Sequence, residues 1–434
     1  MINEDLFDFI EKSPTAFQAV DNIAKTLKKQ GLKELSEKDK WKLNKGEGYY
    51  VKRNDSSIIA FRVGRNLQTE NKNSYGFAVA ASHSDSPSFK VKENAQITVK
   101  DKYLQLNTEG YGGMICSTWF DRPLSIAGRV IVLEEGKLVS RLYQNNTDLL
   151  MIPSLAIHMN RNVNNGVALN KQVDLLPLFG EKENGEEEFL EFIAKELNVK
   201  KDDIFGHDLF LYNRMKPAIW GRNKEYISGS RLDDLQCAYA SLRGFLDSKN
   251  ESNICVYCCF DNEEVGSATR QGAGSSFFED TLWRINFSLG YTKEDYHRAL
   301  AGSFMLSEDN AHAVHPNHPE KSDVKNCVYM NEGIVIKSHA GQKYASDAVG
   351  MALCRAICKE ENIPFQFFMN RSDEAGGSTL GNIAICRVPI PAVDIGLPQL
   401  AMHSAYESAG AKDTEYMEKF TRCFYENFQN YLID

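Results

Sequence analysis

The chain has 434 residues, of which 42% are hydrophobic and 25% are charged, and its net charge at pH 7 is -9. These proportions are ordinary for a soluble globular protein, and interspersed charges with an acidic balance argue against a nucleic-acid partner, which needs a basic face. The N-terminus MINEDLFDFI lacks the features of a signal peptide, and no stretch approaches the ~20 apolar residues that span a bilayer, so we expect a cytoplasmic protein with no membrane partner.

The first 90 residues predict helices, a hairpin and one buried strand. Residues 4–12 read as a helix, and a second helix is expected to begin with Ser13 as N-cap and to run to Gly31. GYYVKR and SIIAFRVG around NDSS predict a β-hairpin. The apolar run 75–85 predicts a strand buried on both faces of a mixed or parallel sheet, and it ends at His83 and Asp85.

Residues 93–224 differ in sequence pattern from the preceding segment. They are expected to form a β-rich domain inserted into the first one. The run 124–143 predicts two strands around an EEGK turn, and LLMIPSLAI at 149–157 predicts another strand. The acidic segment 180–188 is interpreted as a solvated loop.

From residue 225 onward, helices and strands alternate. This pattern predicts a doubly wound α/β domain with a mixed sheet, made of residues 1–92 and 225–434. The expected helices are 232–248, 275–289, 346–362 and 413–432, and the expected strands are 253–260, 302–310, 365–372 and 391–397. The C-x-x-C in CVYCC lies on one of these strands, where residues three apart point to opposite faces, so a metal or redox role there is disfavoured.

Side chains of one chemical kind follow the predicted strands. Histidine, aspartate and glutamate hold Zn²⁺ and similar ions, and in an open α/β sheet ligands bind beyond the carboxyl ends of the strands. Each residue alone has a plain structural interpretation: a core histidine, a helix N-cap or a solvated loop. Together they predict a site for two metal ions some ~3.5–4 Å apart, whose positive charge lets the carboxylates ionise. The residues are His83, Asp85, Asp233, Asp234, Glu263, Glu264, Asp309 and His403.

Several motifs resemble the aspartyl aminopeptidase family of dinuclear zinc exopeptidases, in the same order and over nearly the whole chain. They are SHSDSPSFKVK, SRLDDL, DNEEVGS, SEDNAHAVHPN, QKYASDAV and PQLAMHS. The resemblance implies that His83 and Asp309 ligate one zinc, that Glu264 and His403 ligate the other, and that Asp233 bridges both. Co²⁺ or Mn²⁺ would also suit such ligands.

The same resemblance implies the roles of two further carboxylates. Asp85 would accept a hydrogen bond from His83 and fix its tautomer. Glu263 would be the general base, with Glu264 facing the other way along an extended backbone.

The resemblance also implies an assembly and a substrate pocket. His158 would reach a neighbouring subunit and stabilise the oxyanion, within a tetrahedral homo-oligomer of twelve subunits (a dodecamer). Lys337, with Tyr344 nearby, is the candidate for binding an acidic first residue, although a solvated lysine after a strand explains it equally well. Gly376 and Gly377 are expected to allow close approach of the substrate.

Two other features bear on substrate access. Glu374 would weaken an acidic preference if it points into the pocket. The tract HAVHPNH places His312, His315 and His318 three apart, but its prolines favour a loop that shapes access over a metal site.

The leading hypothesis is therefore a zinc aminopeptidase that removes the N-terminal residue of peptides, with Asp or Glu preferred. Two alternatives share the metal chemistry: a deacylase or amidohydrolase that acts on N-acyl compounds, and an aminopeptidase with broader preference for neutral residues. A cargo-binding shell without catalysis is the alternative from another class, and the presence of all expected ligands speaks against it.

Overall fold

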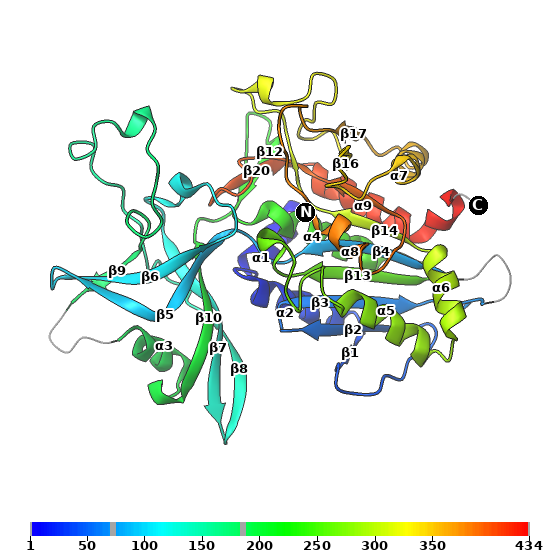
Figure 1. Ribbon diagram of the computed structural model, residues 1–434, viewed down its shortest axis with the longest axis horizontal. Helices are drawn as coiled ribbons and strands as arrows, with labels where there is room; N and C mark the ends of the chain where they lie inside the picture. The colour runs from blue at the N-terminus through cyan, green and yellow to red at the C-terminus, as the bar shows by residue number, and fades with distance from the viewer. Residues whose placement is uncertain (1, 70–74, 183–187, 433–434) are drawn as a thin grey trace. The chain divides into compact units, whose positions relative to one another are not determined.

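The computed structural model describes residues 2–69, 75–182 and 188–432 (Figure 1). Two compact units are present. Unit 1 comprises Met1–Asp85, Pro217–Met402 and Glu407–Asp434, and unit 2 comprises Ser86–Lys216 and His403–Tyr406. The chain thus leaves unit 1 after Asp85, and the segment expected as an insertion, 93–224, overlaps unit 2.

Unit 1 is built on a nine-stranded sheet in the order β1-β2-β3-β13-β4-β14-β18-β16-β17. The strands β13, β4, β14 and β18 are parallel neighbours, whereas the pairs β2/β3, β3/β13 and β16/β18 are antiparallel, so the sheet is mixed. In sheet order the strands are Lys33–Leu35, Gly48–Arg53, Ser57–Val63, Ile254–Phe260, Phe77–His83, Phe304–Glu308, Ala392–Gly396, Ile334–Lys337 and Phe365–Phe368.

Helices cover both faces of this sheet, which confirms the expected doubly wound α/β fold class (Figure 1). One apolar core involves α1 Ile2–Glu11, α2 Ala16–Lys29, α4 Leu232–Asp247, α7 Ala348–Glu360 and α9 Asp413–Asn427. The core on the other face involves α5 Phe277–Ser288, α6 Lys293–Ala301 and α8 Leu380–Ala384. Each strand of the sheet centre feeds both cores, because successive side chains point to opposite faces.

The central strands β4 and β13 are buried along their whole length, as their apolar sequences predict. Cys255 packs in the first core and Cys258 in the second, so the C-x-x-C does not form a pair on one face. The hairpin of β2 and β3 is also confirmed.

One helix boundary differs from the prediction. The N-cap of α2 is Thr15 and not Ser13. Ser13 is fully buried, its carbonyl oxygen accepts a hydrogen bond from Arg231 Nε, and its Oγ accepts one from Asn22 Nδ2. These distant partners hold Ser13 in the turn before the helix.

A second, five-stranded sheet in unit 1 joins segments from three parts of the chain. Its order is β11-β12-β20-β19-β15. The strands are Ala218–Trp220, Tyr226–Gly229, Glu407–Gly410, Pro398–Leu400 and Ala311–His312. Strand β12 leads directly into α4, and β15 follows β14 by two residues.

Unit 2 is a six-stranded antiparallel sheet with its own core, which also packs helix α3 Phe189–Leu197. The order is β8-β7-β10-β5-β6-β9. The strands are Lys137–Gln144, Leu124–Glu134, Ile204–Asn213, Ser88–Val99, Tyr103–Tyr111 and Leu178–Glu181. The hairpin around EEGK is confirmed as β7 and β8, whose turn residues Glu135 and Gly136 both have positive φ.

The segment 149–157 does not form the predicted strand, because only Leu150, Met151 and Ile152 make isolated bridges and residues 153–157 are exposed loop. Within the acidic segment 180–188, residues 183–187 lie outside the described residues, and Gly180 and Glu181 end β9.

Short 3-10 helices occupy Cys116–Trp119, Val163–Asn165, Lys201–Asp203, Glu263–Val265, Pro319–Lys321 and Phe428–Tyr431. Among the helices of the described ranges, none has both the length and the apolar character that crossing a membrane would require.

Candidate metal centre

The carboxyl ends of three neighbouring parallel strands bring the first site residues together. Strand β4 ends at His83, β13 ends directly before Asp261, and β14 ends directly before Asp309. In the register of β4 and β13, His83 lies opposite Phe260. The side chains that follow these strands therefore gather at one edge of the sheet, as the strand-end argument predicts.

Four buried side chains form a cluster at this edge. His83, Asp233, Asp234 and Asp309 each offer one nitrogen or oxygen atom, and these atoms lie within 4.8 Å of one another. His83 Nε2 is 3.3 Å from a carboxylate oxygen of Asp233 and 3.8 Å from one of Asp309. One histidine and three carboxylates facing each other are a donor set that suits a divalent cation.

The start of helix α4 places Asp233 and Asp234 in the cluster. Both have non-helical backbone angles, and the peptide bond between them is cis. The N-cap of α4 is Arg231, so the interpretation of this Asp pair as a helix cap is wrong. The backbone N–H of Asp233 donates to Glu407 Oε2 at 3.0 Å, and Asp234 Oδ2 accepts from the backbone N–H of His83 at 3.1 Å.

Asp85 connects His83 to the two glutamates. His83 Nδ1 lies 3.0 Å from the backbone carbonyl oxygen of Asp85 and 3.5 Å from its carboxylate. The same carboxylate accepts the backbone N–H of Glu263 at 3.1 Å and that of Glu264 at 3.2 Å. Asp85 thus fixes both the histidine ring and the segment that carries the glutamates.

Glu263 and Glu264 lie in the 3-10 helix Glu263–Val265, which follows Asn262 in the left-handed region. The expectation of an extended backbone here is wrong: two hydrogen bonds to Asp85 and three within the turn curl the chain directly after the strand. A carboxylate oxygen of Glu264 and one of Asp233 lie within 4.8 Å, so the turn still brings Glu264 to the cluster.

The protonation of these groups is strongly perturbed. Burial raises the pKa of Asp234 well above its usual value, although His83 opposes this. Burial alone would lower the pKa of His83, but the surrounding aspartates, led by Asp234, raise it. Burial, together with the charges of Asp309 and Asp85, raises the pKa of Glu263 to about 8. The protein alone therefore holds protons in this cluster, and a dication would supply the charge that lets the carboxylates ionise.

Lys337, at the end of β16, is buried beside Asp309. Its side chain is only 3% exposed, so the interpretation as a solvated lysine is wrong. Its Nζ donates to the carbonyl oxygen of Asn310 at 2.8 Å and lies 3.7 Å from a carboxylate oxygen of Asp309. It also lies 5.6 Å from the ring centre of Tyr344, which is buried as well.

The glycines of the predicted pocket lie on a loop held by a second lysine. Lys343 Nζ donates to the carbonyl oxygens of Ala375 and Gly376 at 2.6 and 3.0 Å. Gly376 has a φ of +61°, and a Cβ there would lie 2.3 Å from Asn370 Nδ2, so any larger residue would strain the backbone and displace the Asn370 side chain. Gly377 is exposed and open space surrounds it.

Two predicted site residues belong to unit 2. His403 Nδ1 lies 2.9 Å from the carbonyl oxygen of Gly113 in the same unit, a contact that fixes the orientation of the ring. His158 lies exposed in a turn, outside any helix or strand of the unit. Of the three histidines in HAVHPNH, His312 ends β15, and His315 and His318 bridge each other in a loop, as the prolines predict.

The sequence predicts Asp234 as a site residue, and the structure places it in the buried cluster. Two other residues of this centre, Glu407 and Asn310, have no signal in the sequence. Glu407 and Asn310 bind Asp233 and Lys337 through a backbone N–H and a backbone carbonyl. Backbone contacts of this kind leave no pattern in the sequence.

Comparisons with known proteins agree with one another. The model of a family described as aminopeptidase I zinc metalloprotease (M18) matches residues 9–425. A probable M18 family aminopeptidase 2 from Clostridium acetobutylicum is 48% identical over 425 residues, which is 97% of each chain.

Solved structures of similar proteins cover the whole fold. A structure of the complex of Ape4 and Nbr1 contains a chain that is 34% identical with a TM-score of 0.95, and the match covers 99% of this chain and 87% of that one. The S. cerevisiae mApe1 dodecamer is 27% identical with a TM-score of 0.86, over 99% of this chain and 97% of that one.

Proposed function

This chain belongs to the M18 family of zinc metalloaminopeptidases, and we propose that it removes the N-terminal residue of peptides at the cluster around His83. The family membership confirms the resemblance to zinc aminopeptidases that the sequence motifs indicate. The protein is therefore a metal-dependent peptide hydrolase. The observation that supports the location is the buried set of His83, Asp233, Asp234 and Asp309.

The proposed ligands follow the resemblance. His83 and Asp309 would hold one zinc ion, Glu264 and His403 would hold a second, and Asp233 would contribute to both; cobalt or manganese would suit the same donors. Zinc bound there supplies a Lewis acid that polarises a carbonyl oxygen and lowers the pKa of water. Asp234 and Asp85 keep His83 in place through its backbone N–H and its Nδ1.

Glu263 is the proposed general base. Its carboxylate takes a proton from the attacking water and returns it to the leaving amine. One feature of the structure supports this role: the Asp85 carboxylate accepts the backbone N–H of Glu263 and so fixes the segment that carries this side chain.

The preference for a first residue with an acidic side chain is the finer part of the proposal. Lys337 is the proposed cation, and it lies next to Asp309 and Tyr344. An acidic side chain would compete with the carbonyl oxygen of Asn310 for its Nζ. Preference for neutral residues is the alternative, favoured if Lys337 keeps its present partners.

We further propose a homo-oligomer of twelve subunits in the cytoplasm. The similar S. cerevisiae mApe1 is a dodecamer. His158 is exposed, which is what reaching the active site of a neighbouring subunit requires. There it would donate a hydrogen bond to the oxyanion of the peptide carbonyl.

The test is hydrolysis of aspartyl-, glutamyl- and leucyl-anilides by the zinc-loaded protein, each compared with its N-acetylated form. We expect release of anilide from the free amines only, with the acidic substrates fastest. Release of acetate from the acetylated compounds would instead identify a deacylase, and faster cleavage of the leucyl substrate would identify an aminopeptidase for neutral residues.

A further inference from the structure

A fully buried carboxylate lies on β18, the strand next to the one that ends before Asp309. In the register of β14 and β18, Asp394 pairs with Ser307, two residues before Asp309. A carboxylate at this depth needs hydrogen-bond donors from the protein. One oxygen of Asp394 accepts the backbone N–H of Ala345 at 2.5 Å, and the other accepts the hydroxyl of Thr379 at 2.5 Å. Two segments far apart in the sequence thus meet at one side chain.

The first of these segments carries Tyr344. Ala345 follows Tyr344 directly, and the hydroxyl oxygen of Ser346 accepts the backbone N–H of Asp394 at 2.9 Å, so two consecutive residues are bound to β18. The ring centre of Tyr344 lies 5.6 Å from Lys337 Nζ. Asp394 therefore fixes the backbone beside the proposed side-chain pocket, which consists of Lys337 and Tyr344.

Lys337 itself lies next to Asp394 on the neighbouring strand. Ile336 of β16 pairs with Ile395 of β18 in antiparallel register. The next pair in this register is Lys337 and Asp394, and both side chains point away from the core that the two isoleucines share. A Cβ at Gly396 would lie 3.0 Å from Lys337 Cε. The lysine side chain thus extends over β18 on the face that carries Asp394.

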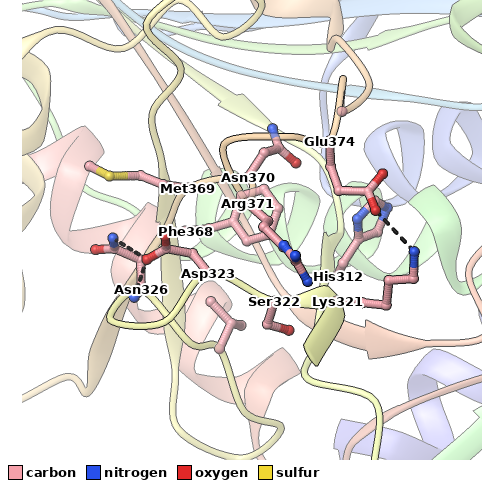
Figure 2. A pocket seen from close by; sticks show the side chains of 12 residues that line it. His312, Lys321, Ser322, Asp323, Asn326, Phe368, Met369, Asn370, Arg371 and Glu374 are labelled. Atoms are coloured by element: carbon pink, nitrogen blue, oxygen red, sulfur yellow. Dashed lines mark hydrogen bonds and ion pairs between the residues drawn. The ribbon is translucent and has the colours of Figure 1, made fainter. Parts of the chain in front are cut away.

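The second segment is the loop of residues 370–378, which ends at Thr379. This loop supplies part of the wall of a cavity of about 310 Å³ (Figure 2). On that side Glu374 forms an ion pair with Lys321, drawn with a dashed line, and both side chains are exposed. Such a pair stabilises little. Thr379 is buried, so its hydrogen bond to Asp394 is the stronger attachment of the loop.

We propose that Asp394 is a positioning residue for the first side chain of the substrate. By holding the Tyr344 segment and the loop 370–378 on one carboxylate, it keeps the side-chain pocket in a fixed place beside Asp309. Thr379 acts through Asp394. This inference rests on the proposed aminopeptidase function and holds for acidic and neutral side chains alike, because it concerns the position of the pocket.

The test compares substrates with and without a side chain. The measured quantity is kcat/KM for glutamyl-anilide and for leucyl-anilide, each divided by kcat/KM for glycyl-anilide, which has no side chain to place in the pocket. Thr379→Val keeps the shape of the side chain and removes the hydroxyl, so both ratios should fall about three- to tenfold, the range of one hydrogen bond. Asp394→Asn leaves one acceptor oxygen for two donors and should lower both ratios about 10–100-fold, the range of hydrogen bonds to a charged group.

Two variants serve as controls. Thr379→Ser keeps a hydroxyl that can donate the same hydrogen bond, so its ratios should equal those of the wild type. Asp347→Asn makes the same change of side chain as D394N, in the residue after Ser346. The Asp347 carboxylate caps α7 by accepting the backbone N–H of Gly350 at 2.9 Å, and asparagine also caps helices, so the ratios should again equal those of the wild type.

Zinc content and kcat/KM for glycyl-anilide should be unchanged in all four variants. If T379V slowed glycyl-anilide as much as the other substrates, or gave the same ratios as T379S, Asp394 would have a purely structural role and the proposal would be overturned. The T379V and T379S pair decides this even if D394N does not fold. If the zinc-loaded wild type cleaves no aminoacyl-anilide, the proposed function itself fails and this inference falls with it.

Discussion

Glu263 is the residue on which the proposed chemistry depends most. Replacing it with Gln keeps the size of the side chain and removes its ability to accept a proton. We expect kcat of the Glu263→Gln variant to fall by about 10²–10⁴, the contribution of a positioned general base. Metal content, measured by elemental analysis, should equal that of the wild type. Loss of metal in this variant would show that Glu263 is a ligand, and normal turnover would remove it from the mechanism.

Asp85 links His83 to the turn that carries Glu263 and Glu264. It contacts His83 Nδ1 and accepts the backbone N–H groups of both glutamates. Asp85→Ala removes the carboxylate that accepts the backbone N–H groups of Glu263 and Glu264, so both the ligand and the base lose their fixed positions. Removing such outer partners typically costs 10–100-fold in metal affinity or activity, and we expect a loss in that range for zinc affinity in a competition titration. Unaltered zinc affinity would mean that the turn holds its shape without Asp85.

Local sequence patterns predicted the strands and helices that lie in one kind of environment along their whole length. The strands Phe77–His83 and Ile254–Phe260 are apolar along their length because both of their faces are covered by helices. The segment 149–157 is equally apolar but makes no strand, since pairing depends on neighbours that its sequence does not encode.

The candidate site could likewise be predicted only in part from the sequence. His83 and Asp309 could be predicted to meet because their strands are parallel neighbours in one sheet. The turn at Glu263 could not be predicted, because the hydrogen bonds that shape it come from Asp85, 178 residues earlier. Glu407 reaches Asp233 from a strand of the smaller sheet, 174 residues later.

Helix α9 begins with a buried carboxylate that makes stability depend on pH. Asp413 is fully buried and accepts the backbone N–H groups of Asn331 and Gly333 at 2.7 and 3.1 Å. Burial raises its pKa from 3.8 to about 7 despite these hydrogen bonds. Between about pH 4 and pH 7, Asp413 is ionised in the unfolded chain and protonated in the folded chain. The contribution of the protonated carboxyl to stability is therefore fully present below pH 4 and is lost as pH rises through 7.

Asp413→Asn should therefore flatten this dependence. The variant loses one acceptor at every pH. As pH rises from 4 to 8, the free energy of unfolding of the wild type should fall relative to that of the variant by on the order of 2–4 kcal/mol. Unfolding followed against pH measures this difference, with the exposed Asp202→Asn as control. If the free energies of unfolding of the wild type and of D413N changed in parallel with pH, the raised pKa of Asp413 would be contradicted.

For the whole molecule, the proposed assembly makes activity depend on the exposed His158. His158→Ala should reduce kcat by about 10²–10³, the usual effect of losing one oxyanion donor, without changing the metal content. The mass in solution, measured by sedimentation, should stay that of the wild-type oligomer. Met159→Ala, a change at the neighbouring exposed residue, is the control. A fully active H158A would exclude the histidine from the mechanism, and a wild-type monomer with full activity would exclude the need for assembly.

Membership of the M18 family covers the chain from residue 9 to residue 425, so both units take part in the shared fold. The central claim is narrower: the groups around His83 hold the catalytic metal. Diffraction from crystals of the zinc-loaded protein, collected on both sides of the zinc absorption edge, tests it directly. An anomalous peak within bonding distance of His83 Nε2, Asp233 and Asp309 is the predicted result. Zinc bound elsewhere, with no peak between these three side chains in an active crystal, would contradict the account.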